Sequence, residues 1–123
     1  MSENKLSPCY RYRCALKRVI DGDTIVVDID LGLRIWAHDV PIRLAGIDAP
    51  DAEPAKGEAT TWARMWLASR EPLGLTIETT KTEKYGRWLG TVWGLDPGTH
   101  EPQCLNDAMV AASKAVSYEG GKK

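Results

Sequence analysis

Acidic and basic side chains gather in three short segments whose residue types suit cleavage of a phosphodiester bond. The segments are VIDGDT at Val19–Thr24, IRLAGIDAPD at Ile42–Asp51 and KYGR at Lys84–Arg87. A hard divalent cation takes several oxygen ligands, and carboxylates at the ends of neighbouring strands can supply them. Asp23 and Asp48 fit that role. A cation held there would polarise a phosphate oxygen and help to orient an attacking water.

Two arginines and a third carboxylate complete the chemistry that such a cation would need. Phosphoryl transfer gathers negative charge on the phosphate oxygens, and a guanidinium can donate two hydrogen bonds to them. Arg43 and Arg87 are the candidates for this role. A carboxylate that is not a direct metal ligand must take the proton from water, and Asp51 is the nearest in sequence.

Each segment also has an ordinary structural interpretation when it is taken alone. Asp21-Gly22-Asp23 is typical of a hairpin turn, Asp48–Asp51 of a capped turn, and Lys84–Arg87 of a solvated hairpin tip. Only the combination of the three segments indicates a site.

The rest of the chain predicts the elements that must position these residues. Residues 31–39 are expected to be a loop or an extension of a hairpin around Gly32. A helix is expected over Gly57–Ser69, where Trp62 and Trp66 belong to an apolar stripe, and a second helix can open at Pro102. Its buried stripe would be Leu105, Ala108, Met109 and Ala112. Alternating apolar residues predict strands at Tyr10–Ile20, Ile25–Ile29, Val40–Ile47, Leu73–Ile77 and Leu89–Trp93.

This element order predicts an α+β fold built on a five-stranded barrel of the OB type. One helix lies between the third and fourth strands and one after the fifth, and such barrels are common platforms for nucleic acids. We expect a flexible arm at residues 1–8, one domain at residues 9–119 and a disordered tail at residues 120–123.

Charge is unevenly distributed along the 123 residues, although the formal net charge is only -1. Residues 1–20 carry five bases and one acid, whereas residues 21–58 carry nine acids and three bases. Arg11, Arg13, Lys17 and Arg18 form a basic run that is either a phosphate-tracking stripe or solubilising charge. The acidic middle is interleaved with strand-like sequence, which favours a polar face or a cation site over a tail.

Other sequence features bound the location of the protein. No apolar run approaches the roughly 20 residues of a membrane span, so no membrane partner is expected. The first twenty residues lack an apolar signal region, which predicts a cytoplasmic protein, with a phage or mobile-element origin as one source. Cys9, Cys14 and Cys104 lack zinc-site spacing and are expected to be free thiols.

The order and wording of the three segments resemble the staphylococcal nuclease (thermonuclease) family, over about Tyr12 to Tyr118. The resemblance includes Gly57-Glu58-Ala59 at the start of the first helix. It implies an OB barrel and calcium-dependent hydrolysis of DNA or RNA that leaves 3′-phosphate ends.

The resemblance also assigns roles to individual residues. It implies one Ca²⁺ ion held by the carboxylates of Asp23 and Asp48 and by the backbone carbonyl of Ala49, with Asp21 in the outer shell. Arg43 and Arg87 correspond to the phosphate-binding arginines of catalysis. The residues expected to hold the substrate are Lys84, Tyr85 and Tyr118.

One residue departs from the family pattern. The general-base position is normally glutamate, and here it is Asp51, one methylene shorter. Retracting a base by roughly 1 Å can cost about 100-fold in rate. Glu53 and Glu58 are therefore alternative bases.

Strand parity also separates Arg43 from Asp48, so both can face one phosphate only if the chain turns or bulges near Gly46.

The sequence therefore predicts a monomeric, metal-dependent nuclease with little sequence preference that acts on single-stranded DNA or RNA. The rival hypothesis is a non-catalytic or weakly catalytic OB module that binds nucleic acid or a protein partner.

Overall fold

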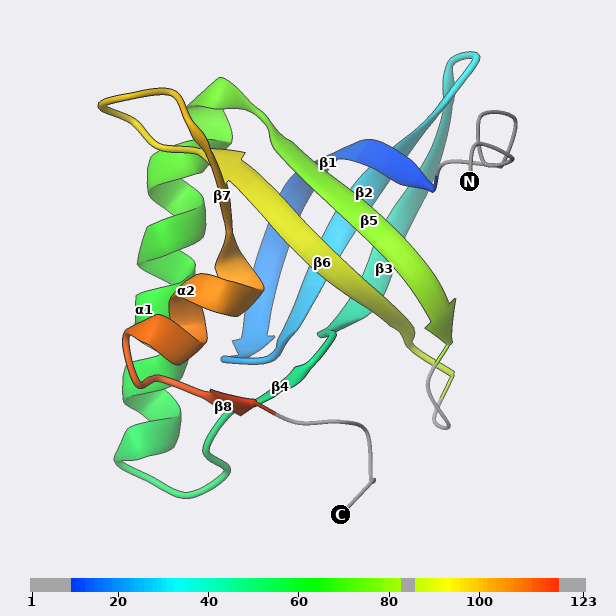
Figure 1. The fold of residues 1–123 in the computed structure, drawn as a ribbon. Coiled ribbons are helices and arrows are strands. Elements are labelled where there is room, and N and C mark those ends of the chain that lie inside the picture. The colour runs from blue at the N-terminus through cyan, green and yellow to red at the C-terminus, as the bar shows by residue number, and fades with distance from the viewer. Residues whose placement is uncertain (1–9, 83–85, 118–123) are drawn as a thin grey trace, which may run out of the picture.

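Five strands close into a barrel in the computed structural model, which describes residues 10–82 and 86–117 (Figure 1). The neighbours run in the order β3-β2-β1-β5-β6, and a parallel pairing of β3 with β6 closes the ring. This mixed barrel confirms the predicted OB-type α+β fold. Its strands are β1 (Arg11–Asp21), β2 (Thr24–Gly32), β3 (Ile35–Leu44), β5 (Leu75–Thr82) and β6 (Trp88–Leu95).

Three short strands outside the barrel were not predicted from the sequence. The strand β7 (Pro102–Cys104) pairs with β6 and extends that edge of the sheet. The strands β4 (Ile47–Asp48) and β8 (Val116–Ser117) form a separate antiparallel pair. This pair lies beside the end of the barrel where β1 finishes and β2 begins (Figure 1).

The hairpin between β2 and β3 settles the alternatives for residues 31–39 in favour of an extended hairpin. The two strands are paired out to Gly32 and Ile35. Leu33 and Arg34 form the tip with φ angles of 57° and 66°. Two consecutive positive φ angles are typical of the two-residue turns that match the twist of antiparallel strands.

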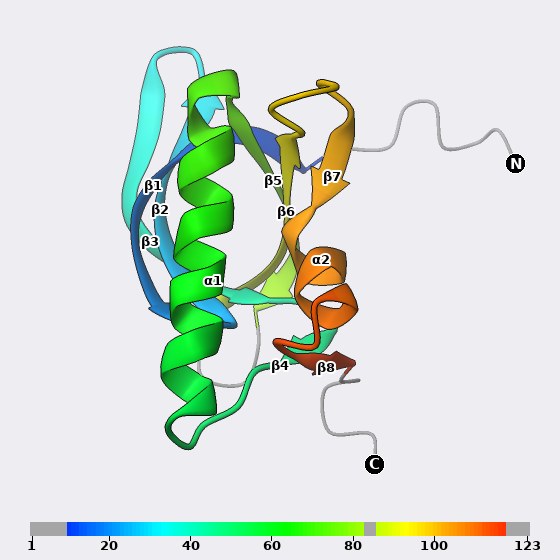
Figure 2. The same ribbon diagram turned by 90° about the vertical axis from the view of Figure 1, so that its left-hand side faces the viewer.

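Two α-helices pack against the barrel (Figure 2). The helix α1 (Ala55–Arg70) buries Ala59, Ala63, Trp66 and Leu67, and Trp62 packs partly buried beside them, as the apolar stripe predicts. A 3₁₀ turn, η2 (Glu71–Leu73), leads from α1 to β5.

The second helix differs from the prediction in its bounds. The helix α2 (Leu105–Ala111) begins three residues after Pro102, which instead opens β7, and Ala112 lies just past its end. A proline has no N–H to donate but tolerates an extended φ at the first residue of an edge strand. Leu105 and Met109 are nonetheless fully buried on its inner face.

The core fills the barrel and the space beneath both helices. Its largest fully buried side chains are Ile25, Ile42, Leu44, Leu67, Leu75, Ile77, Leu105 and Met109. Burying one such side chain contributes about 1.5–3 kcal/mol, so this cluster holds the strands that carry the candidate site. In the described part of the chain, no helix is long and apolar enough to cross a membrane.

The described cysteines, Cys14 and Cys104, are buried free thiols, as the sequence predicts. Burial and, to a lesser extent, the charge of Glu71 raise the pKa of the Cys14 thiol to about 12. Cys9, the expected arm at residues 1–8 and the tail at residues 120–123 lie outside the described residues.

Candidate active site

Arg43 links two carboxylates that lie 25 residues apart in the sequence. Its Nη1 atom lies 3.4 Å from Oδ2 of Asp23, and its Nη2 atom donates a hydrogen bond of 3.1 Å to Oδ1 of Asp48. The β2–β3 register explains the first contact, because Arg43 pairs with Thr24, which follows Asp23 directly. The structure therefore brings together three of the predicted site residues.

A turn at Gly46 brings Asp48 to the same guanidinium. Gly46 has a φ of +78°, which a glycine adopts without steric cost, and the chain re-enters a strand at Ile47. Arg43 stabilises this turn from inside, because its Nη1 atom donates to the carbonyl of Ile47 at 3.0 Å. The turn that strand parity required near Gly46 is present.

Asp23 is held in one orientation by the backbone around it. Its Oδ2 atom accepts a hydrogen bond of 2.9 Å from the amide of Ala49, and its Oδ1 atom accepts one of 3.2 Å from the Thr24 hydroxyl. The side chain of Asp23 is only 13% exposed, whereas that of Asp48 is 51% exposed. One carboxylate is thus fixed in the protein and the other faces solvent.

Gly22 allows the acidic turn to lie directly against both helices. A Cβ atom at Gly22 would lie 2.9 Å from Cβ of Ala59 on α1 and 3.2 Å from Cε of Met109 on α2. Both separations are shorter than ordinary carbon contacts of about 3.5–4.0 Å. Any side chain at this position would push the turn that carries Asp23 away from the helices.

Asp21, the predicted outer-shell acid, faces α1 rather than Arg43. Its Oδ1 atom lies 3.8 Å from Nζ of Lys56, and both side chains are more than a third exposed. This ion pair ties the end of β1 to the first turn of α1. At that exposure it adds little to stability.

The three candidate bases have different surroundings. Asp51 is exposed and lines a hollow of about 240 Å³ together with Asp48 and Ala49. Glu53 accepts a hydrogen bond of 2.9 Å from the amide of Gly57 at the start of α1. Glu58 is exposed on the first turn of α1 and lines a different hollow. Among the described residues, Asp51 is the candidate base that lines the same hollow as Asp48.

Arg87 lies just before β6, the strand that closes the barrel by pairing with β3. The parallel register pairs Ile42 with Trp88 and Arg43 with Leu89, so Arg87 enters the sheet next to the strand that carries Arg43. Its Nε atom is buried. The next residue, Trp88, is 43% exposed. Lys84, Tyr85 and Tyr118 lie outside the described residues.

Asn106 supports the site and was missed by sequence reasoning. Its buried amide nitrogen donates to the carbonyls of Ala45 at 2.8 Å and Gly90 at 3.1 Å, and its carbonyl accepts from the amide of Val92 at 3.1 Å. Asn106 therefore ties α2 to the end of β3, the strand that carries Arg43, and to β6, which follows Arg87. Because it lies on a helix dominated by apolar residues, no sequence signal marks it.

Lys114 is a second residue that sequence reasoning missed. It lines the hollow that contains Asp48 and Asp51, through the segment between α2 and β8. Its side chain adds one positive charge to a hollow that Asp48 and Asp51 also line. A lone lysine in a loop carries no sequence signal of such a position.

The donor chemistry of the site suits a hard cation such as calcium. Asp23 and Asp48 contribute two carboxylates against one guanidinium, which leaves the group with a net charge of -1. Oxygen donors are the ligands that Ca²⁺ prefers. Across residues 10–82 and 86–117, however, no three acidic, cysteine or histidine side chains are close enough together to form a complete side-chain metal cluster. Backbone carbonyl or water oxygens would have to complete the coordination.

Comparisons with known proteins point to nucleases. The chain is 33% identical over 85 residues to the thermonuclease of Staphylococcus intermedius, covering 63% of this chain and 46% of that protein. It is 29% identical over 110 residues to the micrococcal nuclease of Shigella flexneri, covering 87% of this chain and 59% of that protein.

A further relative carries a name that states no nuclease activity. The chain is 36% identical over 104 residues to protein ParB of Escherichia coli, covering 82% of this chain and 54% of that protein. No protein-family model matches the chain. The chain spans about half the length of the curated relatives it matches.

The likeness to thermonucleases and a micrococcal nuclease agrees with the closed mixed barrel and its two helices. Together these findings support a staphylococcal nuclease-like family for the chain.

Proposed function

We propose that the protein is a calcium-dependent nuclease that hydrolyses DNA or RNA with little sequence preference and leaves 3′-phosphate ends. The single observation that carries this proposal is the contact of one guanidinium, Arg43, with two carboxylates, Asp23 and Asp48. The nuclease relatives support the same class of reaction.

The arginines are proposed to hold the scissile phosphate. Arg43 is 14% exposed and is fixed by the carbonyl of Ile47, so its direction is set before substrate arrives. Preorganised donors of this kind stabilise developing charge better than mobile ones. Arg87 supplies the second guanidinium from the neighbouring strand. A calcium ion bound by Asp23, Asp48 and the Ala49 carbonyl would add positive charge beside the phosphate oxygens.

Asp51 is proposed as the base that takes the proton from the attacking water. The water oxygen bonds to phosphorus, the bond to the 5′ oxygen breaks, and that oxygen leaves with a proton from solvent. Asp51 is favoured over Glu53 because Glu53 already accepts the Gly57 amide. Asp51 is also favoured over Glu58, because Asp51 shares a hollow with Asp48.

Substrate contacts at Lys84, Tyr85 and Tyr118 follow from the family resemblance and remain proposals. Asp21 is proposed to act outside the coordination shell, since it faces Lys56. We also propose that the protein is a cytoplasmic monomer and that it prefers single-stranded substrates.

Hydrolysis of labelled single-stranded DNA and RNA tests the proposal, with calcium or with chelator. Asp23→Asn, Asp48→Asn and Arg87→Gln are expected to lose most activity, whereas Arg64→Gln, an exposed arginine on α1, is the matched control. Loss of activity in chelator is expected for every active form. Hydrolysis that survives both chelator and the site substitutions would show that the activity arises elsewhere.

Two substitutions at one position test the proposed base. Asp51→Asn is expected to lower the rate at least about 100-fold, the usual contribution of a positioned base. Asp51→Glu is expected to raise the rate, because it restores the missing methylene. An unchanged rate in Asp51→Asn would move the role to Glu53, Glu58 or unassisted water.

The rival function, a binding module without catalysis, predicts a different result in the same assay. The protein would then retain strands without cutting them, in calcium as well as in chelator. The separation of binding from cutting is therefore the decisive measurement.

A further inference from the structure

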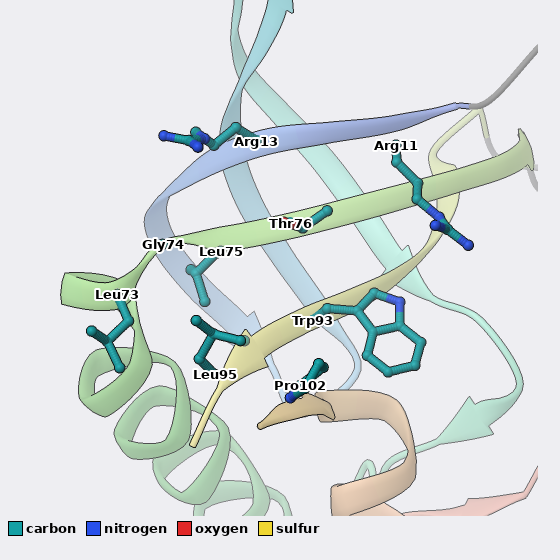
Figure 3. A pocket seen from close by; sticks show the side chains of 10 residues that line it. Arg11, Arg13, Leu73, Gly74, Leu75, Thr76, Trp93, Leu95 and Pro102 are labelled. Carbon is teal, nitrogen blue, oxygen red and sulfur yellow. The ribbon is translucent and has the colours of Figure 1, made fainter. Parts of the chain in front are cut away.

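A groove lies on the outer surface of the barrel, away from the candidate active site (Figure 3). It has a volume of about 480 Å³, within the range of roughly 300–1,000 Å³ that small-molecule sites span. None of its lining residues belongs to the candidate active site. Its lining consists of Arg11, Arg13, Leu73, Gly74, Leu75, Thr76, Trp93, Gly94, Leu95 and Pro102.

Strand register places a cation and an aromatic side chain in one row across this groove. Arg13 on β1 pairs with Thr76 on β5, and Thr76 pairs with Trp93 on β6. Neighbouring strands lie about 4.8 Å apart, so Arg13 and Trp93 stand roughly 10 Å apart at the backbone. Their sequence neighbours Cys14 and Val92 are buried, so this row faces outward.

A second cation lies one step along the same face. Arg11 pairs with Glu78 in the β1–β5 register, and its Nε atom lies 3.6 Å from Oε1 of Glu78. The Arg11 side chain is 62% exposed, so this pair leaves most of the guanidinium accessible to a ligand. Within the described residues, Arg13 is exposed and makes no ion pair.

The two ends of the groove differ in chemistry. In Figure 3 the guanidinium of Arg11 and the indole of Trp93 lie toward one end, whereas Leu73 and Leu95 lie toward the other, next to η2. The guanidinium of Arg13 points toward that second end. A ligand that matches the first end carries negative charge and a flat ring. Nucleotides in a single strand present both groups at each step, because their bases are not paired.

We infer that this groove binds a single-stranded segment of nucleic acid, with phosphates on Arg11 and Arg13 and a base against Trp93. The inference deepens the proposed function and rests on it for the substrate class. The groove holds part of the strand outside the candidate active site. An acidic peptide would satisfy the arginines but would leave the flat face of Trp93 without a specific partner, so the nucleic acid is favoured.

Binding of a fluorescein-labelled oligothymidylate in chelator tests this inference without hydrolysis. The variant Arg11→Gln/Arg13→Gln is expected to bind about 10-fold more weakly, while Arg64→Gln is the matched control for one lost guanidinium. The slope of log affinity against log salt should fall by roughly 0.7 for each phosphate contact removed.

Trp93 is tested by a pair of substitutions. Trp93→Leu is expected to weaken binding about 10-fold, within the range for loss of one base–aromatic stack, whereas Trp93→Phe retains most of the affinity. Thermal unfolding is measured for each variant. If Trp93→Leu fails to fold, the affinity of Arg11→Gln/Arg13→Gln still tests the inference, because both arginines are exposed.

Two outcomes would overturn the inference. One is that the groove variants bind oligothymidylate as tightly as Arg64→Gln does, with the same salt slope. The other is that polyglutamate competes for the groove as well as unlabelled oligothymidylate does, which would assign it to an acidic protein.

Failure of the nuclease proposal gives a different pattern. Hydrolysis of a dinucleotide in calcium reports on the candidate active site, because so short a substrate cannot extend to the groove. Suppose that the dinucleotide is not hydrolysed, but the groove substitutions still weaken binding of oligothymidylate. The nuclease proposal would then be wrong, and the inference about the groove would stand.

Discussion

The two ends of the barrel hold their arginines in opposite ways. At the end where β1 finishes and β2 begins, the Arg43 side chain is 14% exposed and contacts two carboxylates and two backbone carbonyls. Near the start of β1, the Arg11 side chain is 62% exposed and makes one ion pair of 3.6 Å. The first arrangement fixes the direction of the Arg43 guanidinium, and the second keeps the charge of Arg11 accessible to a ligand.

This difference matches the demands of the two proposed tasks. Stabilising a transition state requires donors that are oriented before the reaction, since a displacement of about 1 Å can cost 100-fold in rate. Holding a strand of any sequence requires charge and a ring face that tolerate variation. The same barrel thus combines a rigid end with an adaptable groove.

The largest expected effect comes from removing the fixed arginine. Arg43→Gln should lower the hydrolysis rate by about 10²–10³-fold, as loss of one preorganised donor does. Oligothymidylate affinity in chelator should change by less than about 3-fold, because most strand contacts lie in the groove. Steady-state hydrolysis and fluorescence anisotropy on the same preparation measure the two effects. Equal losses of hydrolysis rate and of oligothymidylate affinity would contradict the distinction between a rigid end that cuts and a groove that binds.

Asn106→Ala tests how far the rigid end depends on buried polar contacts. The substitution removes the partners of the Ala45 carbonyl and the Val92 amide, and an unsatisfied buried group costs about 1–3 kcal/mol. We expect the free energy of unfolding to fall by about 2–4 kcal/mol in urea titrations. Asp107→Ala, an exposed neighbour on α2, is the control. A loss below about 1 kcal/mol would mean that water replaces the amide.

Gly22→Ala tests the close approach of the acidic turn to the helices. The new methyl group would meet Cβ of Ala59 at 2.9 Å, and overpacking of this kind costs about 1–3 kcal/mol. Hydrolysis should fall with stability, because the turn carries Asp23. Gly98→Ala, in an exposed turn with its nearest contact at 3.4 Å, is the control for loss of a glycine. Thermal unfolding and activity are measured together, and a normal Tm would show that the turn relaxes freely.

Sequence alone predicted the barrel and the grouping of the site because both rest on local signals. Alternation in Ile25, Val27 and Ile29 marks a strand with one buried face, and Asp-Gly marks the turn that precedes it. The need for a turn near Gly46 followed from strand parity. That need was conditional, because strand parity alone places Arg43 and Asp48 on opposite faces and a turn is required only if both face one phosphate.

The features that sequence did not predict depend on tertiary contacts. Residues 31–36 expose Leu31, Leu33 and Ile35, so no buried face reveals that the strands continue there. The short strands β4 and β8 form only because α2 returns the chain beside Ile47. Asn106 and Lys114 acquire their positions from this same return, which leaves no periodic signal.

The smallest expected effect is on stability at the adaptable groove. The Arg11–Glu78 pair is exposed, and pairs of this kind contribute roughly 0–1 kcal/mol because water screens them and both side chains lose freedom. Arg11→Gln/Arg13→Gln should therefore change the free energy of unfolding by no more than about 0.5 kcal/mol, while strand affinity falls. Urea unfolding at low and high salt measures the first quantity, and Arg64→Gln provides the baseline. A loss as large as that of Asn106→Ala would show that the groove arginines hold the barrel together, and the contrast between a rigid end and an accessible groove would then be lost.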